Sequence, residues 1–422
     1  MVFHAILPLF SVFLYLLDYT KDTWFFVYLY NRLQFINDRC SLLRGLIYFY
    51  GASIGIAAFL MSFVIQINSG ILDLDAKFRI LFVILSPLVP VTIIVKAVTL
   101  AVSKSKLEVR WRRNSKNAAA KWEKYRELDE ENLEVMEAYS DLKMVECSTE
   151  AVPQFYFLVI FTIASVLLPR TSGLGLLKDN SGYSWAFLVF SLTTTYATII
   201  MSILSAMDIR KNGQLGLKQK AILGLSTTFQ LMAHLCQMVP IALLALPLSD
   251  NPAADGSDDA SLSPTQAGLL LVAPIVFRWI FNASSLEAGF QGLLKKDKFL
   301  HVLANTWVTI PLRHKNAERQ VRKSSEIRRS LVLAGFNIIL TWAMTTTALS
   351  GKRSSALTSD TKFYLVLLLP AIAALISHLL GCLFLDLHYK ATHPWRELFI
   401  WQRQEGIKDG IVEEVPFWDE VS

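Results

Sequence analysis

Long apolar runs constrain the fold of this chain more than any other feature. A helix that crosses a bilayer needs about 20 apolar residues, at 1.5 Å of rise per residue. The chain is 53% hydrophobic and only 18% charged, whereas a soluble domain has about 25% charged residues. We therefore expect an all-α polytopic membrane protein. The apolar runs cover roughly 3–30, 44–67, 77–103, 143–168, 182–207, 221–248, 266–288, 331–349 and 362–387.

The connecting segments indicate which side of the membrane each one faces. Segments 104–126 and 313–329 are dense in Lys and Arg, and the connection 208–220 adds four more basic residues. Positively charged loops stay in the cytoplasm. The loop 249–265 has four aspartates and no Lys or Arg, which suits the outside. Counting spans between these loops predicts a cytoplasmic N-terminus and a cytoplasmic C-terminus.

Two apolar segments do not fit as complete spans. Segment 77–103 contains Pro87 and Pro90 in mid-run, where proline breaks a helix and frees carbonyl groups. A re-entrant hairpin is expected there; a Pro-kinked span with an external N-terminus is the alternative. Segment 290–312 is interrupted by three lysines and is expected to be only partly embedded.

The same order of segments occurs twice: span, span, partly embedded segment, basic loop, span, span. We therefore expect about eight transmembrane helices in two parallel repeats, plus two partly embedded or re-entrant helices. The stretch 115–142 is expected to be an exposed charged helix. The predicted domains are a first membrane repeat over 1–207, with re-entrant 77–103 and basic segment 104–142, a second over 208–387, with embedded 290–312 and basic loop 313–330, and a cytoplasmic tail over 388–422.

Acidic residues inside two spans are the strongest candidates for a site. Asp18 and Asp22 are four residues apart, as are Glu146 and Glu150, so each pair lies on one helix face. Burying one charge in lipid costs about 2.5–3.5 kcal/mol, and four would cost roughly ten. The acids must therefore face protein, water or a polar ligand. The expected polar residues of the path are Asp18, Asp22, Glu146, Glu150, Gln154 and Arg278.

Two interpretations of these acids remain open and are compatible. The acids pair with basic residues and fasten the helices together, or they form a polar stripe along which a charged group crosses the membrane. The candidate counterions are Lys21, Lys96, Lys143 and Arg278. His234 and Gln237 are interpreted as hydrogen-bonding residues between helices.

The four cysteines show no CxxC spacing and three of them lie in apolar runs, which favours buried thiols over a zinc site. The chain has no P-loop, HExxH, GxSxG or GxGxxG motif. We therefore expect no enzyme, no cofactor and no metal.

Three motifs resemble the XK-related (XK/Kell blood-group-like) membrane protein family. They are LDYTKDTWFFVYLY in the first run, KMVECSTEAVPQF around Glu146 and Glu150, and LFLDLHYKATHPW at the last span. The segment order is similar over nearly the whole chain. Two departures stand out: no Arg follows Pro240, and Asn337 stands where the family has a glutamate.

The resemblance implies ATP-independent phospholipid scrambling between the leaflets of the plasma membrane. It implies phospholipid head groups as partners, phosphatidylserine among them, and a single-pass chaperone or lipid-transfer protein as a protein partner. A homodimer is left open, and no nucleic acid is expected. Two alternatives stand beside it: a secondary transporter of a small solute, and a non-catalytic membrane scaffold of a lipid-transfer complex.

The C-terminal tail bears on how such an activity would be switched. Family members activated by caspases need an Asp-x-x-Asp site in an exposed tail. From His388 to Ser422 the chain has only Asp409 and Asp419, with no aspartate three residues before either. We therefore expect that caspase cleavage of the tail does not activate this protein.

Overall fold

The computed structural model describes eight continuous ranges of the chain and some isolated residues. Within these residues every regular element is a helix and no strand occurs, as the sequence predicted. The described residues are 2–32, 41–67, 118–167, 182–210, 215–244, 264–289, 295–308 and 368–392, with isolated helical residues in 91–103 and 331–346.

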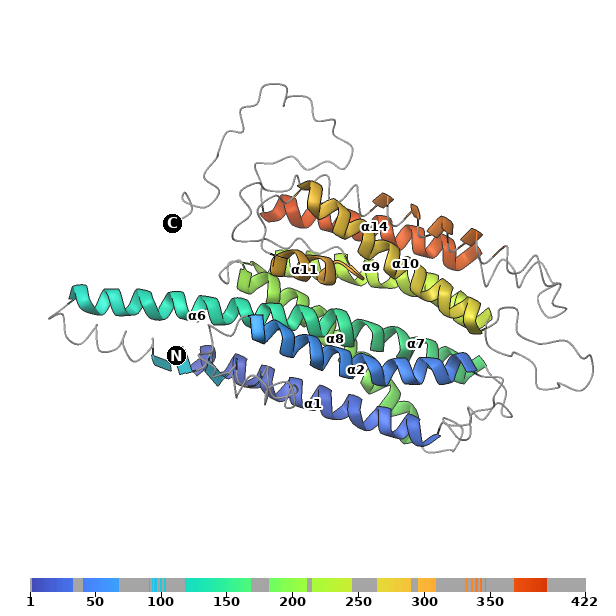
Figure 1. Cartoon of the computed structure of the whole chain (residues 1–422), viewed down its shortest axis with the longest axis horizontal. Coiled ribbons are helices and arrows are strands. Elements are labelled where there is room, and N and C mark those ends of the chain that lie inside the picture. Colours follow the sequence, from blue (N-terminus) through green and yellow to red (C-terminus); the bar gives the residue numbers. More distant parts are fainter. Residues whose placement is uncertain are drawn as a thin grey trace, which may run out of the picture.

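The long helices run side by side along the longest axis of the molecule (Figure 1). In that view α1 and α2 lie on one side, α9, α10 and α14 on the other, and α6, α7 and α8 between them. The helices are α1 (Val2–Arg32), α2 (Ser41–Ile67), α6 (Ala118–Glu146), α7 (Val152–Leu167), α8 (Gly182–Arg210), α9 (Leu217–Leu244), α10 (Pro264–Gly289), α11 (Lys295–Ala304) and α14 (Leu369–Thr392), with the π-helical segment η4 (Cys147–Ala151) joining α6 to α7.

Four of the described helices are long and apolar enough to cross a membrane. Their apolar stretches are Arg44–Met61, Ala186–Met207, Leu217–Ala242 and Leu369–His388, in α2, α8, α9 and α14. They coincide with four of the eight predicted spans. Helices also form over 3–30, 143–167 and 266–288, but that these cross the membrane stays a prediction.

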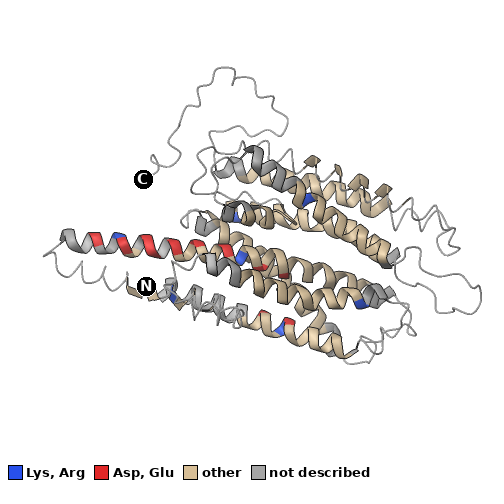
Figure 2. Cartoon of the chain, viewed as in Figure 1, with Lys and Arg blue, Asp and Glu red and all other residues tan. Residues whose placement is uncertain are grey.

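The described parts of the charged stretch 115–142 and of the apolar stretch 143–168 form one continuous helical rod rather than two separate helices. The rod runs from Ala118 through η4 to Leu167. Its first turns are exposed, as at Glu123 and Arg126, and it becomes buried from Val135 onward. Figure 2 shows that the acidic residues, drawn in red, are concentrated on this part of α6.

The two segments expected to be partly embedded meet on α6. Ile93 and Leu100, from the segment expected to be re-entrant, and Leu300 and Leu303, from α11, belong to one buried cluster around α6 and the end of α2. After Ala304 the chain turns, with the Thr306 N–H donating to Leu303 O at 3.1 Å. Residues 303–308 are all buried. The buried residues of both segments are thus packed against α6.

Glycines make room for neighbouring helices at two places. A Cβ at Gly381 of α14 would lie 2.7 Å from Gln230 Cγ and 3.3 Å from Gln230 N of α9. Ser226 of α9 donates to Gly381 O at 2.7 Å. A Cβ at Gly51 of α2 would overlap the ring of Phe26 of α1. The close backbone approach of α9 and α14 at Gly381 is typical of membrane helix pairs.

Several predictions fall on residues outside the described ranges. These are most of the re-entrant segment 77–103, both basic loops, the acidic loop 249–263, Asn337 and the tail from 393. The two parallel repeats and the domain boundaries also stay predictions.

Candidate functional site

Asp18 and Asp22 of α1 share one ammonium group. Lys21 Nζ lies 2.6 Å from Asp18 Oδ1 and 3.3 Å from Asp22 Oδ1. It also donates to Thr194 and Thr195 of α8, at 3.1 and 3.2 Å. Lys21 is therefore held by α1 itself and by the hydroxyl-rich stretch of α8, and it ties the two helices together.

Asp22 also accepts a hydrogen bond from a residue of α2. Tyr50 donates its hydroxyl to Asp22 Oδ1 at 3.0 Å, and both side chains are almost completely buried. Because Tyr50 and Phe25 pack edge to face, with ring centroids 5.7 Å apart, the hydroxyl is fixed in position. Three helices thus converge on the carboxylates of α1.

Glu146 is the last residue of α6, and its counterion lies one turn earlier on the same helix. Lys143 Nζ lies 2.7 Å from Glu146 Oε2, and each side chain is less than one-tenth exposed. An ion pair taken out of water is costly unless the geometry is good. The short distance and the i, i+3 spacing supply that geometry.

The π-helical segment η4 begins directly after Glu146 and contains Glu150. The Val152 N–H donates to Cys147 O, five residues earlier. Pro153 follows and has no N–H to donate. The Ser148 carbonyl, five residues before Pro153, instead accepts from Trp307 Nε1 at 2.6 Å. A side chain from the segment after α11 therefore satisfies a carbonyl that the helix leaves open, as membrane proteins require.

Glu150 is less completely bonded than the other acids. Its one described hydrogen bond comes from Gln154 Nε2, at 3.4 Å to Glu150 Oε1. Gln154 is fully buried, and its Oε1 has no described hydrogen-bond partner. Glu150 lies within electrostatic range of Asp22, Asp18 and Glu146. The acids of α1 and of the α6–η4 rod therefore form one group.

We call this group the acidic cluster: Asp18, Lys21, Asp22, Lys143, Glu146 and Glu150. It holds four carboxyl groups and two ammonium groups, so the acids outnumber the bases. The side chain of Asp18 is 15% exposed, and Thr194 is also partly exposed. The cluster thus reaches the surface of the bundle beside α1 and α8.

Two of the four candidate counterions lie in the acidic cluster and two do not. Lys21 and Lys143 pair with the acids, as described above. Lys96 instead lies 3.1 Å from Glu131 of α6, outside the acidic cluster. The described contacts of Arg278 are likewise elsewhere.

Arg278 of α10 belongs to a second buried polar group. It donates to His234 Nε2 at 2.8 Å, to Asn305 O at 2.9 Å and to Trp307 O at 3.2 Å. The hydrogen bond to His234 of α9 agrees with the interpretation of that residue as a link between helices. The structure does not bring Arg278 into the acidic cluster. Trp307, whose carbonyl accepts from Arg278, donates its own N–H to Ser148 O of η4.

Sequence reasoning did not select Tyr50, Thr194 or Trp307 as site residues. A tyrosine in an apolar helix is typical of an interfacial residue, and nothing local distinguishes Tyr50 from its neighbours. For Trp307 an indication was present: Pro153 implies an open carbonyl that needs a donor.

The fold and the site define an all-helical membrane-type protein with a buried, carboxylate-rich ion-pair cluster. Among the described residues, no group of His, Cys, Asp and Glu could hold a metal ion. Comparison with family models, curated proteins and solved structures gave no match to this chain.

Proposed function

We propose that this protein is a phospholipid scramblase of the XK-related type, which moves lipids between the leaflets of the plasma membrane without ATP. The observation that carries the proposal is the acidic cluster. It has more carboxyl groups than ammonium groups, it lies in an apolar helical bundle, and it reaches the bundle surface at Asp18 and Thr194.

A lipid head group must cross about 30 Å of hydrocarbon while its tails stay in lipid. Polar residues on one side of a groove lower that barrier without forming a closed pore. The excess carboxylates suit the amine of phosphatidylserine or phosphatidylethanolamine. Glu150 and Gln154 have hydrogen-bonding capacity beyond their mutual contact. Asp18, at the partly exposed edge, would meet the head group first.

A second candidate is a non-catalytic membrane scaffold that holds a single-pass or lipid-transfer partner. The observation in its favour is the burial and pairing of most of the cluster: Lys21 joins α1 to α8, and Tyr50 joins α2 to α1. Ion pairs of this kind fasten helices whether or not a lipid passes. Secondary transport of a small solute stands as the third candidate.

The test reconstitutes the purified protein in liposomes with a fluorescent phospholipid and an impermeant quencher. Scrambling lets the quencher reach lipid that began in the inner leaflet, so fluorescence falls below the half-way level of protein-free liposomes. Uptake of a soluble solute in the same liposomes supports a transporter. If the liposomes show neither scrambling nor solute uptake, the result supports a scaffold.

The variant for this assay is the double substitution Glu146→Gln, Glu150→Gln, with Glu130→Gln on the exposed part of α6 as the control. The double variant should lose lipid movement, surface expression, or both, and the control should keep both. Normal surface expression together with normal lipid movement in the double variant would contradict the proposal.

A further inference from the structure

The ammonium group of Lys21 lies among more hydrogen-bond acceptors than one lysine can use. Its Nζ lies 2.6 Å from Asp18 Oδ1, 3.1 Å from Thr194 Oγ1, 3.2 Å from Thr195 Oγ1 and 3.3 Å from Asp22 Oδ1. An ammonium group has only three N–H donors and accepts nothing. These oxygens, from α1 and α8, therefore surround the position of one ammonium group, and Lys21 fills that position.

Two of the acceptors are held in place by contacts that do not involve Lys21. Thr194 Oγ1 lies 2.9 Å from Phe190 O and 3.1 Å from Ser191 O, to which it donates. Since the hydroxyl proton is used there, the same oxygen can only accept from another group. Asp22 Oδ1 is fixed by the hydroxyl of Tyr50, at 3.0 Å. The position is thus built for a group that donates, whether or not that group is Lys21.

The position opens to the bundle surface at one edge. The side chain of Asp18 is 15% exposed and that of Lys21 is 5% exposed, and Thr194 is partly exposed between α1 and α8. Lysine carries its charge on a flexible four-carbon stem. Such a stem stays packed while the ammonium group moves out to a polar surface. Lys21 is therefore a replaceable occupant, and a ligand has access from the side of Asp18.

The four oxygens select one class of cation. The head groups of phosphatidylethanolamine and phosphatidylserine carry a primary ammonium group, which has three N–H donors like that of Lys21. The quaternary ammonium group of phosphatidylcholine has none. Its methyl groups would leave the buried oxygens without donors, which is unfavourable.

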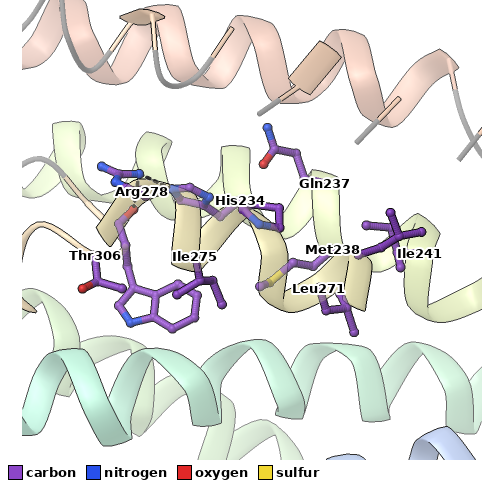
Figure 3. Close-up of a pocket in the computed structure, with 11 residues that line it drawn as sticks. His234, Gln237, Met238, Ile241, Leu271, Ile275, Arg278 and Thr306 are labelled. Atoms are coloured by element: carbon purple, nitrogen blue, oxygen red, sulfur yellow. Dashed lines mark hydrogen bonds between the residues drawn. The ribbon is translucent and has the colours of Figure 1, made fainter. Parts of the chain in front are cut away.

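The cavity between α9 and α10 does not offer the same chemistry. Arg278 and His234 lie on its lining together with mostly apolar residues, as Figure 3 shows. Its volume of about 20 Å³ admits one water molecule, and the guanidinium repels a second cation. A primary ammonium group therefore fits at the position of Lys21 and not in this cavity.

We propose that Asp18, Asp22, Thr194 and Thr195 form a binding site for a primary ammonium group, and that Lys21 fills it until the amine of a lipid head group replaces it. Lys21 thus closes the acidic cluster to head groups that cannot donate hydrogen bonds. The assignment of the amine to a lipid rests on the proposed scrambling function. The site itself does not, because any primary ammonium ion of suitable size has the same chemistry.

The experiment follows thermal unfolding of the full chain carrying Lys21→Ala, purified in a maltoside detergent. The substitution removes the occupant and leaves the four oxygens. Ethylammonium chloride should raise the melting temperature of this variant by several degrees and then saturate, because a ligand that binds only the folded state stabilises it. Tetramethylammonium chloride at the same concentration should leave the melting temperature unchanged.

Three controls locate the effect. The wild-type protein should not respond to ethylammonium, because Lys21 fills the site. Lys21→Gln keeps N–H donors and occupies the space, so it should not respond either. Lys96→Ala removes an ammonium group 3.1 Å from Glu131 in a partly exposed pair, and it should show no saturating response.

A second pair of ligands distinguishes a lipid from a free amine. Short-chain phosphatidylethanolamine should stabilise Lys21→Ala, and phosphatidylcholine with the same acyl chains should not. If ethylammonium stabilises the variant but neither lipid does, the lipid part of the proposal is wrong. This outcome is separate from the liposome assay, which measures lipid movement by the wild-type protein and fails or succeeds without reference to Lys21.

The yield of folded protein gives a second measurement where Lys21→Ala does not fold in plain buffer. Extraction in ethylammonium should then give more folded variant than extraction in tetramethylammonium. Equal effects of the two cations, on the melting temperature or on the yield, would overturn the site. A response of Lys21→Gln as large as that of Lys21→Ala would place the amine elsewhere in the protein and overturn it as well.

Discussion

The acidic cluster and the group around Arg278 differ in the partners that the structure describes for their buried charged side chains. Both place ionisable side chains inside an apolar helical bundle. In the first, carboxylates lie 2.6–3.3 Å from ammonium groups that come from the same two helices. In the second, a guanidinium donates to neutral acceptors on α9 and on the segment after α11.

The difference shows what holds each part of the bundle together. Around the acidic cluster, α1, α2, α6 and α8 are joined by charged and polar side chains. Between α9 and α14 the backbones approach closely at Gly381, and Phe229 stacks on Phe384 with centroids 5.5 Å apart. The first region depends on charge compensation, and the second depends more on packing. Four substitutions test this contrast.

The largest effect is expected for Lys143→Met. It leaves the carboxylate of Glu146 buried without its ammonium partner, which costs about 3–5 kcal/mol. Unfolding of the purified protein in detergent, or its yield in membranes, measures the loss. The double variant Lys143→Met, Glu146→Leu removes both charges and should recover most of the stability. If the single variant is as stable as the double, the charge-compensation account of the first region is wrong.

Trp307→Phe tests the contact that links the two regions. The substitution keeps the ring but removes the N–H that satisfies Ser148 O, so it should cost about 1–3 kcal/mol. Pro153→Ala restores a backbone N–H near the open carbonyl. In that background Trp307→Phe should cost much less, and equal costs in both backgrounds would show that the indole does not serve this carbonyl.

Gly381→Ala tests the packing of the second region. The new Cβ meets Gln230 Cγ first, which is part of a flexible side chain, so we expect a moderate loss of about 1 kcal/mol. Gly268→Ala on α10 is the matched control, because nothing lies within 4 Å of a Cβ there. Equal melting temperatures for the two variants would argue that α9 and α14 can separate without penalty.

The sequence predicted the helical class, four spans that the structure describes and the burial of the acids. It did so because lipid penalises an unpaired charge and an open backbone group, whatever the tertiary fold. It could not assign counterions: Lys96 and Arg278 carry the right charge, but tertiary packing places their described contacts elsewhere. It also missed the π-helical segment at Glu150, since no residue pattern distinguishes it from an α-helix broken by Pro153.

The smallest effect is expected on the exposed part of α6, the helix that also carries Lys143 and Glu146. Arg126 Nε lies 3.6 Å from Glu130 Oε1, and both side chains are about two-thirds exposed. Exposed pairs of this spacing contribute about 0.3–0.5 kcal/mol, because water and salt screen them. Arg126→Met removes a positive charge from α6, as Lys143→Met does, but at an exposed position instead of a buried one. It should therefore barely shift the melting temperature. The small shift should vanish at high salt, whereas the loss in Lys143→Met should persist. A loss in Arg126→Met that approaches that of Lys143→Met would mean that burial does not set the strength of these pairs.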